Sequence, residues 1–258
     1  MRQVKCAFLL VGAAIISAAS FAQPAVAQQR LVFGFDGSFP PFASIDAAGQ
    51  MHGFDVDLVK AVCDELKAKC ELKNIPWDGI FTALESGKID VVAAALNITD
   101  ERKKKYLMTT SYLKSPFVFM VPKASNVSSA PSLSGQAVGV VGGSIPEKYL
   151  REKLKSISVQ GYDSIDAAVL DLDAGRVAAV FSEQVNLEPA FVRAKPGVYK
   201  IVGSPVEDPA YVGQGKGFAL QKDKTELLQK INQALAKIDA NGERSKLSVK
   251  WFGTQVTK

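Results

Sequence analysis

The segments "LESGKIDVVAAA" (84–95) and "LDAGRVAAVFSE" (172–183) decide the fold, because both describe a helix that ends at a glycine and leads into a strand. Each has a leucine, a glycine three residues later, a basic residue, a β-branched residue and then an apolar run. Glycine at this place fits a left-handed helix C-cap. The repetition predicts two similar α/β units in one chain, although a common helix-to-strand connection would look the same.

Strands and helices alternate on both sides of these segments. The predicted strands are 31–35, 71–75, 91–95, 137–141, 158–162 and 178–182, and the predicted helices begin near 55 and span 77–86, 145–155 and 164–174. A further strand near 217–220 and helices through Trp251 end the chain. Such alternation predicts mostly parallel sheets covered by helices, which bind ligands beyond the carboxyl ends of their strands. Two such edges, ending at Ala95 and Glu183, would face each other across a cleft.

Residues 1–27 read as a cleaved signal peptide. Arg2 and Lys5 precede the apolar run "AFLLVGAAII" (7–16), and "AVA" (25–27) supplies the small residues that a signal peptidase recognises. The apolar run is short for a membrane span. We therefore expect a chain that is released into the periplasm, with an uncleaved N-terminal anchor as the alternative.

Composition excludes several classes of function. The 258 residues carry a formal net charge of +5, and "RKKK" (102–105) is the basic run that stands out, which does not indicate nucleic-acid binding. The sequence has one histidine, His52, and a single histidine does not form a metal site by itself. The segment "VGVVGGS" (138–144) lacks the Lys-Ser/Thr ending of a phosphate loop. No metal or other cofactor is expected, and the glycines before Ser144 form either an anion-binding turn or a purely structural one.

Cys63 and Cys70 are the cysteines that remain after removal of the signal peptide. An oxidising compartment favours a disulfide between them, with two free thiols as the alternative. In one continuous helix their α-carbons would lie about 10 Å apart, which exceeds the reach of a disulfide. If they pair, the helix must therefore end between them.

The segment "AAALNITDER" (93–102) predicts a buried strand that leads into a helix capped by Thr99. The third helical position usually prefers Glu or Gln, but here it is Arg102, a cation at the positive end of the helix. This placement predicts a negatively charged partner for Arg102. A surface ion pair with a neighbouring acid is the alternative to a bound anion.

Three motifs in order resemble the periplasmic substrate-binding proteins of ABC transporters for polar amino acids, of the family 3 type. They are "FDGSFPPFASIDAAGQMHGFDVDLVKAVCDEL" (35–66), "WDGIFTALESGKIDVV" (77–92) and "NITDERKK" (97–104). The resemblance implies a type II periplasmic binding protein fold: two Rossmann-like α/β lobes with mostly parallel sheets, joined by two crossover strands that act as a hinge. With crossovers near Ser115 and Gly215, lobe one would comprise 30–114 and 216–258, and lobe two 115–215.

The resemblance also implies roles for individual residues. Arg102 would bind the α-carboxylate of the ligand with both prongs of its guanidinium, and Ser144 would add its hydroxyl and amide. Glu183 would accept hydrogen bonds from the α-ammonium, although relatives usually have the shorter aspartate there. Asp36 would meet the distal group of the ligand, Phe39 and Trp77 would sandwich its side chain, and Leu96 and Asn97 would complete the site.

The function implied is extracytoplasmic binding of an amino acid with a cationic or amide side chain and its delivery to a membrane permease by a monomeric protein. Ala94, Ala95, Ile145 and Pro146 make the expected pocket wall more apolar than in well-known histidine or arginine binders. A larger derivative such as an opine therefore stays an alternative ligand. A sensor module and a cyclohexadienyl dehydratase-like enzyme are alternative functions, but the position of the dehydratase's catalytic acid is Asn186, which cannot act as a general acid.

Overall fold

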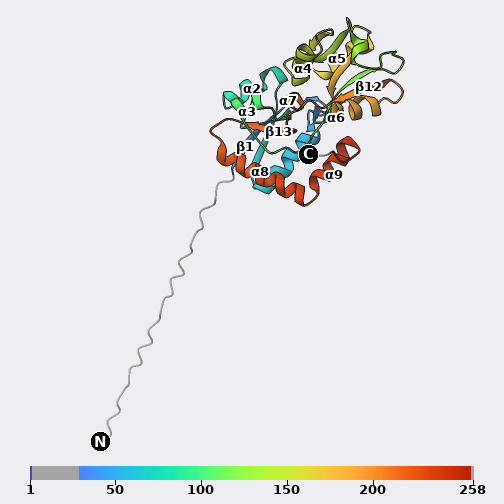
Figure 1. Ribbon diagram of the computed structural model, residues 1–258. Coiled ribbons are helices and arrows are strands. Elements are labelled where there is room, and N and C mark those ends of the chain that lie inside the picture. Colours follow the sequence, from blue (N-terminus) through green and yellow to red (C-terminus); the bar gives the residue numbers. More distant parts are fainter. Residues whose placement is uncertain (2–28, 257–258) are drawn as a thin grey trace.

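The computed structural model describes Met1 and residues 29–256, and two five-stranded sheets form its framework (Figure 1). Helices α4 and α5 lie at the upper end of the molecule in Figure 1, and helices α8 and α9 lie at the lower end. The predicted signal peptide lies outside the described residues, so its cleavage stays a prediction.

The first sheet has the strand order β5-β1-β6-β13-β7. Its strands are β1 (Arg30–Phe35), β5 (Lys69–Asn74), β6 (Val91–Asn97), β7 (Leu107–Met108) and β13 (Lys216–Leu220). The helices that accompany it are α1 (Phe54–Leu66), α2 (Trp77–Glu85), α3 (Asp100–Lys105), α8 (Thr225–Ala240) and α9 (Glu243–Phe252). We call this unit the first lobe.

The second sheet has the strand order β10-β9-β11-β8-β12. Its strands are β8 (Phe117–Pro122), β9 (Ala137–Val141), β10 (Ser158–Tyr162), β11 (Ala179–Glu183) and β12 (Tyr199–Val206). Its helical segments are η1 (Ala130–Leu133), α4 (Ile145–Lys153), α5 (Ile165–Asp173), α6 (Gln184–Leu187), the π-helical η2 (Glu188–Arg193) and α7 (Pro209–Val212). We call this unit the second lobe.

The two sheets share one topology. In the first, β1 pairs in parallel with β5 and β6, and β13 is antiparallel to both β6 and β7. In the second, β9 pairs in parallel with β10 and β11, and β8 is antiparallel to both β11 and β12. Four strands of each sheet therefore run in one direction, and the fifth is the strand that enters after a crossover from the other lobe. This confirms the predicted α/β fold class, whereas sheet pairing does not fix the predicted lobe limits, which stay a prediction.

The alternation of buried side chains on β6 explains how the first sheet is covered. Val91, Ala93 and Ala95 belong to the cluster beneath α1, α8 and α9, whereas Val92, Ala94 and Leu96 belong to the cluster beneath α2. A strand that is apolar on both faces is typical of a sheet covered by helices on both sides. The carboxyl end of this strand is therefore fixed within a few ångströms by packing on both faces.

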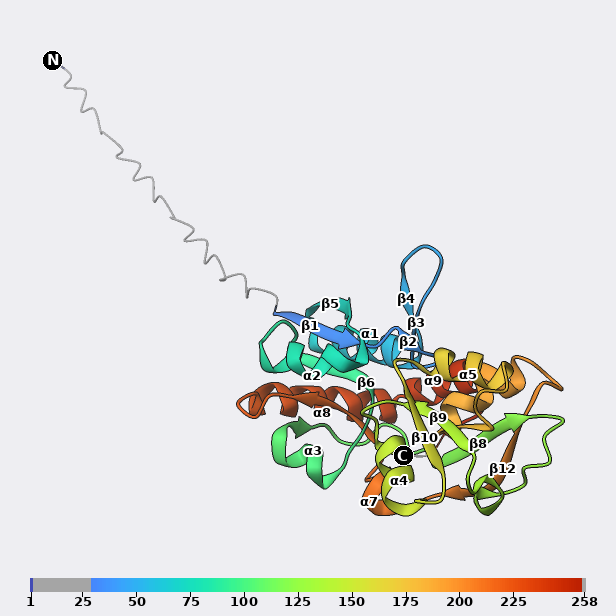
Figure 2. The ribbon, with the colours of Figure 1, turned by 90° about the horizontal axis from the view of Figure 1, so that it is seen from above.

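Some elements were not predicted from the sequence. A small sheet of three short strands, β2 (Ser38–Phe39), β3 (Ala43–Ile45) and β4 (Met51–His52), projects from the first lobe as a hairpin (Figure 2). The strands β7, β8 and β12 were also missed. No helix among the described residues is long and apolar enough to cross a membrane, and no cluster of potential metal ligands occurs in that part of the chain.

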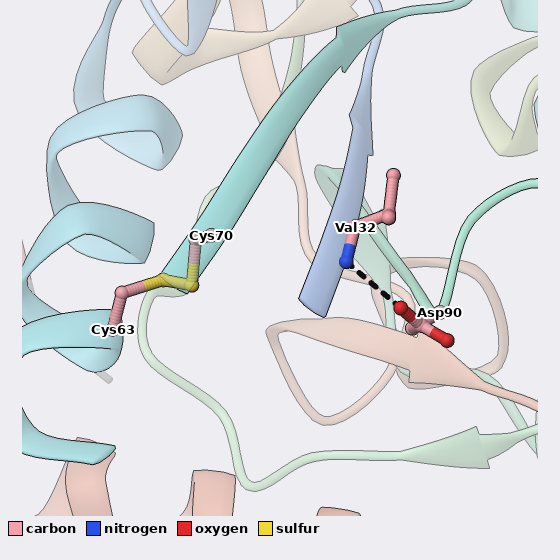
Figure 3. Close-up of a disulfide and its surroundings, with 4 residues drawn as sticks. All are labelled: Val32, Cys63, Cys70 and Asp90. Carbon is pink, nitrogen blue, oxygen red and sulfur yellow. Dashed lines mark hydrogen bonds between the residues drawn. A yellow bond between two sulfur atoms is a disulfide. The ribbon is translucent and has the colours of Figure 1, made fainter. Parts of the chain in front are cut away.

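A disulfide joins Cys63 to Cys70, as Figure 3 shows. Helix α1 ends at Leu66, and Lys67 caps it in the left-handed conformation with φ of 52°. The chain therefore turns back, so that the two α-carbons lie 6.2 Å apart and β5 begins beside the helix end. The expectation that the helix ends between the cysteines is confirmed. On the other side of β1, the amide of Val32 donates to the Asp90 carboxylate at 2.8 Å (Figure 3).

Replacing both cysteines by alanine should lower the free energy of unfolding by about 2 kcal/mol, because the unfolded chain gains the freedom that the short closed loop denies it. Urea unfolding of the wild type and of the Cys63→Ala, Cys70→Ala variant measures the difference. Reductant should destabilise the wild type by a similar amount and leave the variant unchanged. Equal stability of the two oxidised proteins would contradict this prediction.

Candidate functional site

The candidate site is a cavity between the lobes, at the carboxyl ends of β1, β6, β9 and β11. Its walls come from both sheets, as predicted for two facing sheet edges. The lining residues are Asp36, Phe39, Trp77, Ala94, Ala95, Asn97, Arg102, Val141, Ser144, Ile145, Pro146, Phe181, Ser182 and Glu183. The cavity therefore contains charged side chains from both lobes within a largely apolar wall.

Arg102 reaches the cavity from the first turn of α3. Thr99 caps this helix, since its hydroxyl accepts a hydrogen bond from the Arg102 amide at 3.2 Å, which confirms the predicted cap. The guanidinium donates through Nη1 to the carbonyl oxygen of Asn97 at 3.1 Å. Its central carbon lies 5.7 Å from the ring centre of Trp77 and 5.6 Å from that of Phe81, within the range of cation–π attraction. These contacts fix the direction of the side chain and leave further N–H donors for a ligand.

The Arg102 guanidinium has no carboxylate within ion-pair distance among the described residues, so the alternative of a surface ion pair finds no support. Burial lowers the pKa of Arg102 to about 10, and the more distant Glu183 and Glu101 oppose this shift. The side chain is therefore protonated at neutral pH. Arg102 is half-buried, so its cation is partly desolvated without a nearby anion, and a bound anion would offset that cost.

Asp36 follows the end of β1 and is buried at the cavity wall. Its Oδ1 accepts hydrogen bonds from the amide of Ser38 at 3.0 Å and from the hydroxyl of Ser38 at 2.6 Å, which is an Asx turn. Burial raises the pKa of Asp36, and these bonds oppose the shift. The other oxygen makes no hydrogen bond within the described residues. The turn thus holds one oxygen and leaves the other for the cavity.

Phe39 and Trp77 bring aromatic surface to the cavity. Phe39 stacks on Phe42 with ring centres 5.6 Å apart, and Trp77 meets Phe81 edge-to-face at 5.8 Å. Both rings are half-buried and therefore present a free surface, unlike ordinary core residues. They suit a ligand with a flat or cationic side chain.

Ser144 stands at the start of α4 in the second lobe. Its hydroxyl oxygen accepts from the Glu147 amide at 3.3 Å and its amide donates to the Val141 carbonyl at 3.3 Å, so it caps the helix. The hydroxyl hydrogen is not used by this cap and can be donated to a ligand in the cavity. The predicted contribution of the Ser144 amide is less favourable, because that amide already has a partner.

Glu183 ends β11 and forms an ion pair across the lobes with Lys216, at 3.0 Å between Oε1 and Nζ. Its Oε2 accepts from the hydroxyl of Ser182 at 3.0 Å. Lys216 is 1% exposed and also donates to the Ala95 carbonyl at 2.8 Å and to Asn97 Oδ1 at 2.7 Å. Burial lowers the pKa of Lys216, and Glu183 opposes that shift. Sequence reasoning missed Lys216, although a lysine before the apolar strand "GFAL" was a visible signal.

The end of β6 departs from regular strand geometry at the cavity. One residue of β13, Phe218, stands opposite the three residues Ala93–Ala95, and Ala95 has φ of +48°. Asp55 holds this bulge, since its Oδ2 accepts from the Ala95 amide at 2.7 Å. Burial raises the pKa of Asp55 to about 6. The Ala95 carbonyl is thereby turned toward Lys216, out of the sheet.

Of the other two predicted site residues, Asn97 lines the cavity and Leu96 does not. Asn97 lines the cavity, but Lys216 already occupies its Oδ1. Leu96 does not line the cavity: its side chain is 1% exposed and packs with Ile80 and Leu84 beneath α2. Phe181, Ser182 and Val141 line the cavity and were not predicted. They come from strand ends, and an apolar strand residue by itself carries no signal of ligand contact.

Further contacts hold the two lobes together around the cavity. Glu101 on α3 forms an ion pair with Lys148 on α4, and Asn186 Nδ2 donates to the carbonyl of Pro40. Arg193 on η2 also donates to the carbonyl of Phe252 at the end of α9. The two lobes are therefore in direct contact with each other.

Comparison with known proteins agrees with this geometry. The family model for bacterial extracellular solute-binding proteins, family 3, matches residues 31–254. The chain is 37% identical over 252 residues to the putative ABC transporter arginine-binding protein 2 of Escherichia coli, covering 98% of this chain and 99% of the relative. It is 32% identical over 260 residues to the histidine-binding periplasmic protein of Salmonella typhimurium, covering 99% of each.

A solved structure is similar in fold as well as in sequence. It is a periplasmic binding protein of Salmonella typhimurium, described for its high arginine specificity. The TM-score is 0.81 at 31% identity, and the match covers 87% of this chain and 99% of the other.

Replacing Asp55 by asparagine should flatten the pH dependence of stability. The pKa of Asp55 is about 6 in the folded protein and 3.8 in its ordinary state, so the folded protein binds this proton more tightly. Stability from that proton is complete below pH 3.8 and is lost as the pH rises through about 6. The stability of the wild type relative to Asp55→Asn should fall by about 2 kcal/mol between pH 4 and pH 7. Parallel curves from urea unfolding would contradict the prediction.

Proposed function

The chain belongs to family 3 of the bacterial extracellular solute-binding proteins, and we propose that it binds a polar amino acid with a cationic or amide side chain in the cleft. The Escherichia coli relative is named as a binding protein of an ABC transporter, which supports delivery of the bound amino acid to a membrane permease. The names of the relatives, which specify arginine and histidine, support a ligand with a cationic side chain.

The carrying observation is the half-buried Arg102 guanidinium at the cavity, whose one side-chain hydrogen bond within the described residues goes to the Asn97 carbonyl. A guanidinium binds a carboxylate through two parallel hydrogen bonds. The carboxylate of an amino acid supplies the negative charge that the protein does not. The hydroxyl of Ser144 approaches the same cavity from the other lobe and can add a third donor.

Asp36 favours a cation or an amide at the distal end of the ligand. Its free oxygen lies in a wall formed with Phe39 and Trp77, and burial already disfavours the charged carboxylate. A guanidinium or ammonium of the ligand would neutralise it and stack on the aromatic faces. An acidic side chain would instead add repulsion between like charges.

We propose that the two lobes close around the ligand and thereby retain it. Arg102 comes from the first lobe, whereas Ser144 comes from the second, so a ligand contacts both of them only in the closed state. A ligand shifts an equilibrium toward the state in which it makes more contacts. The Glu101–Lys148 and Asn186–Pro40 contacts form across the same cleft and would open together with it.

The alternative of a dehydratase is less favourable on geometric grounds as well. Asn186 is fully buried, and its amide is bound to the Pro40 carbonyl, away from the cavity. Its position therefore does not present a proton donor to a ligand. A sensor that signals to a receptor would use the same cavity, and an uptake defect after deletion of the gene would distinguish transport from sensing.

Replacing Arg102 by lysine should weaken ligand binding by on the order of 2–4 kcal/mol, because an ammonium cannot form the paired hydrogen bonds of a guanidinium. Isothermal titration with the best ligand measures the loss. Arg30→Lys is the matched control, since Arg30 lies exposed at the far end of β1 in an ion pair with Glu71. Equal affinities of Arg102→Lys and the control would remove Arg102 from the site.

A thermal-shift screen tests the side chain of the ligand. Among the amino acids and their derivatives, including citrulline, ornithine and opines, compounds with a distal cation or amide should stabilise the protein most. Asp36→Asn should reduce the stabilisation by cationic ligands more than that by glutamine, because it removes charge and keeps the turn. Asp46→Asn, in a similar turn outside the cavity, is the control. A best ligand such as glutamate or leucine would refute the role of Asp36.

A further inference from the structure

Lys216 fills a complete ammonium-binding position from within the protein. Its Nζ lies 2.8 Å from the Ala95 carbonyl oxygen, 2.7 Å from Asn97 Oδ1 and 3.0 Å from Glu183 Oε1. An ammonium has three donors and no acceptor, so these three bonds satisfy it. The acceptors come from the ends of β6 and β11, at the wall of the cavity.

The negative charge of Glu183 is therefore already paired within the protein. One of its oxygens accepts from Lys216, and the other accepts from the Ser182 hydroxyl. A second ammonium at this carboxylate would lie close to Lys216 and would be repelled by it. Displacement of Lys216 is costly too, because it would leave the buried Ala95 carbonyl and Asn97 amide oxygen without partners.

The charges around the cavity lead to the same conclusion. Glu183 and Lys216 form an ion pair, so together they add no net charge to the cavity. Among the residues that line the cavity, this leaves Arg102 as a cation and Asp36 as an acid, neither of which has an ion-pair partner in the part of the chain that the structure describes. A ligand with one carboxylate and one distal cation pairs both charges, whereas an additional α-ammonium would enter the closed cleft without a counter-charge.

We propose that Lys216 takes the place of the ligand's α-ammonium, so that the cleft prefers ω-guanidino and ω-amino carboxylic acids without a charged α-substituent. The carboxylate binds Arg102, and the single cation binds Asp36 between Phe39 and Trp77. This inference rests on the proposed function: it keeps the carboxylate and the distal cation of the ligand and removes the α-ammonium. It makes Lys216 a determinant of specificity that acts by occupying Glu183.

Isothermal titration of the wild type with matched pairs of ligands tests the inference without any mutation. The pairs are L-arginine with 5-guanidinopentanoate, and L-lysine with 6-aminohexanoate, which differ only in the α-ammonium. The compound without the α-ammonium should bind at least as tightly as its amino acid in the pair that binds better. If Glu183 bound the α-ammonium instead, its loss would weaken binding by roughly tenfold to a hundredfold.

Lys216→Met opens the ammonium position and should reverse the preference. The unpaired Glu183 then accepts an α-ammonium, so the affinity for L-arginine relative to 5-guanidinopentanoate should rise by at least about tenfold. Lys155→Met, which changes an exposed lysine of the second lobe, should leave the ratio unchanged. The double variant Glu183→Gln, Lys216→Met removes both charges and should keep the preference of the wild type. Circular dichroism confirms that each variant is folded before titration.

The outcomes separate the inference from the function on which it rests. A wild type that binds L-arginine or L-lysine more than about threefold tighter than its partner overturns the inference and leaves the proposed function intact. The same holds if folded Lys216→Met shows no change in the ratio. If no member of either pair binds and glutamine also fails, the proposed function is wrong and the inference falls with it.

Discussion

The ion pair between Glu183 and Lys216 is the interaction on which the site depends, because it joins the two lobes at the floor of the cavity. A buried pair is tolerated only when hydrogen bonds satisfy the remaining donors and acceptors. Ser182, Asn97 and the Ala95 carbonyl do so here. The bulge of β6 follows from the same requirement. The left-handed conformation of Ala95 turns its carbonyl toward Lys216, and its amide donates a hydrogen bond to the Asp55 carboxylate. The buried Lys216 thus accounts for the bulge at the end of β6.

The remaining charges of the cavity are arranged for a ligand. Arg102 is oriented by the Asn97 carbonyl and by two aromatic rings, and Asp36 is oriented by its turn with Ser38. Neither charge is neutralised by the protein, which costs stability in the absence of a ligand. A binding protein that closes around its ligand can use this cost, since the ligand then stabilises the closed state more than the open one. The wall formed by Ala94, Ile145 and Pro146 is apolar, so Arg102 and Asp36 determine the orientation of the ligand.

Much of the fold was predictable from the sequence because it follows from local signals. The glycines at 87 and 175, the cap at Thr99 and the cysteine spacing each determine a helix end, and the apolar runs between them identify the parallel strands. The strand β8 was missed because it begins after the crossover from the first lobe, where no helix directly precedes it. At the site, Arg102 was found from its unusual place in a helix. Lys216 was not, because its role depends on a contact with Glu183, 33 residues away in sequence.

A crystal structure of the protein with its tightest ligand tests the central claim most directly. Our account predicts a ligand carboxylate on the Arg102 guanidinium and a distal cation beside Asp36. It also predicts that Lys216 Nζ stays within hydrogen-bond distance of Glu183, Asn97 and the Ala95 carbonyl. A ligand ammonium on Glu183 with Lys216 displaced, or a carboxylate bound away from Arg102, would contradict it.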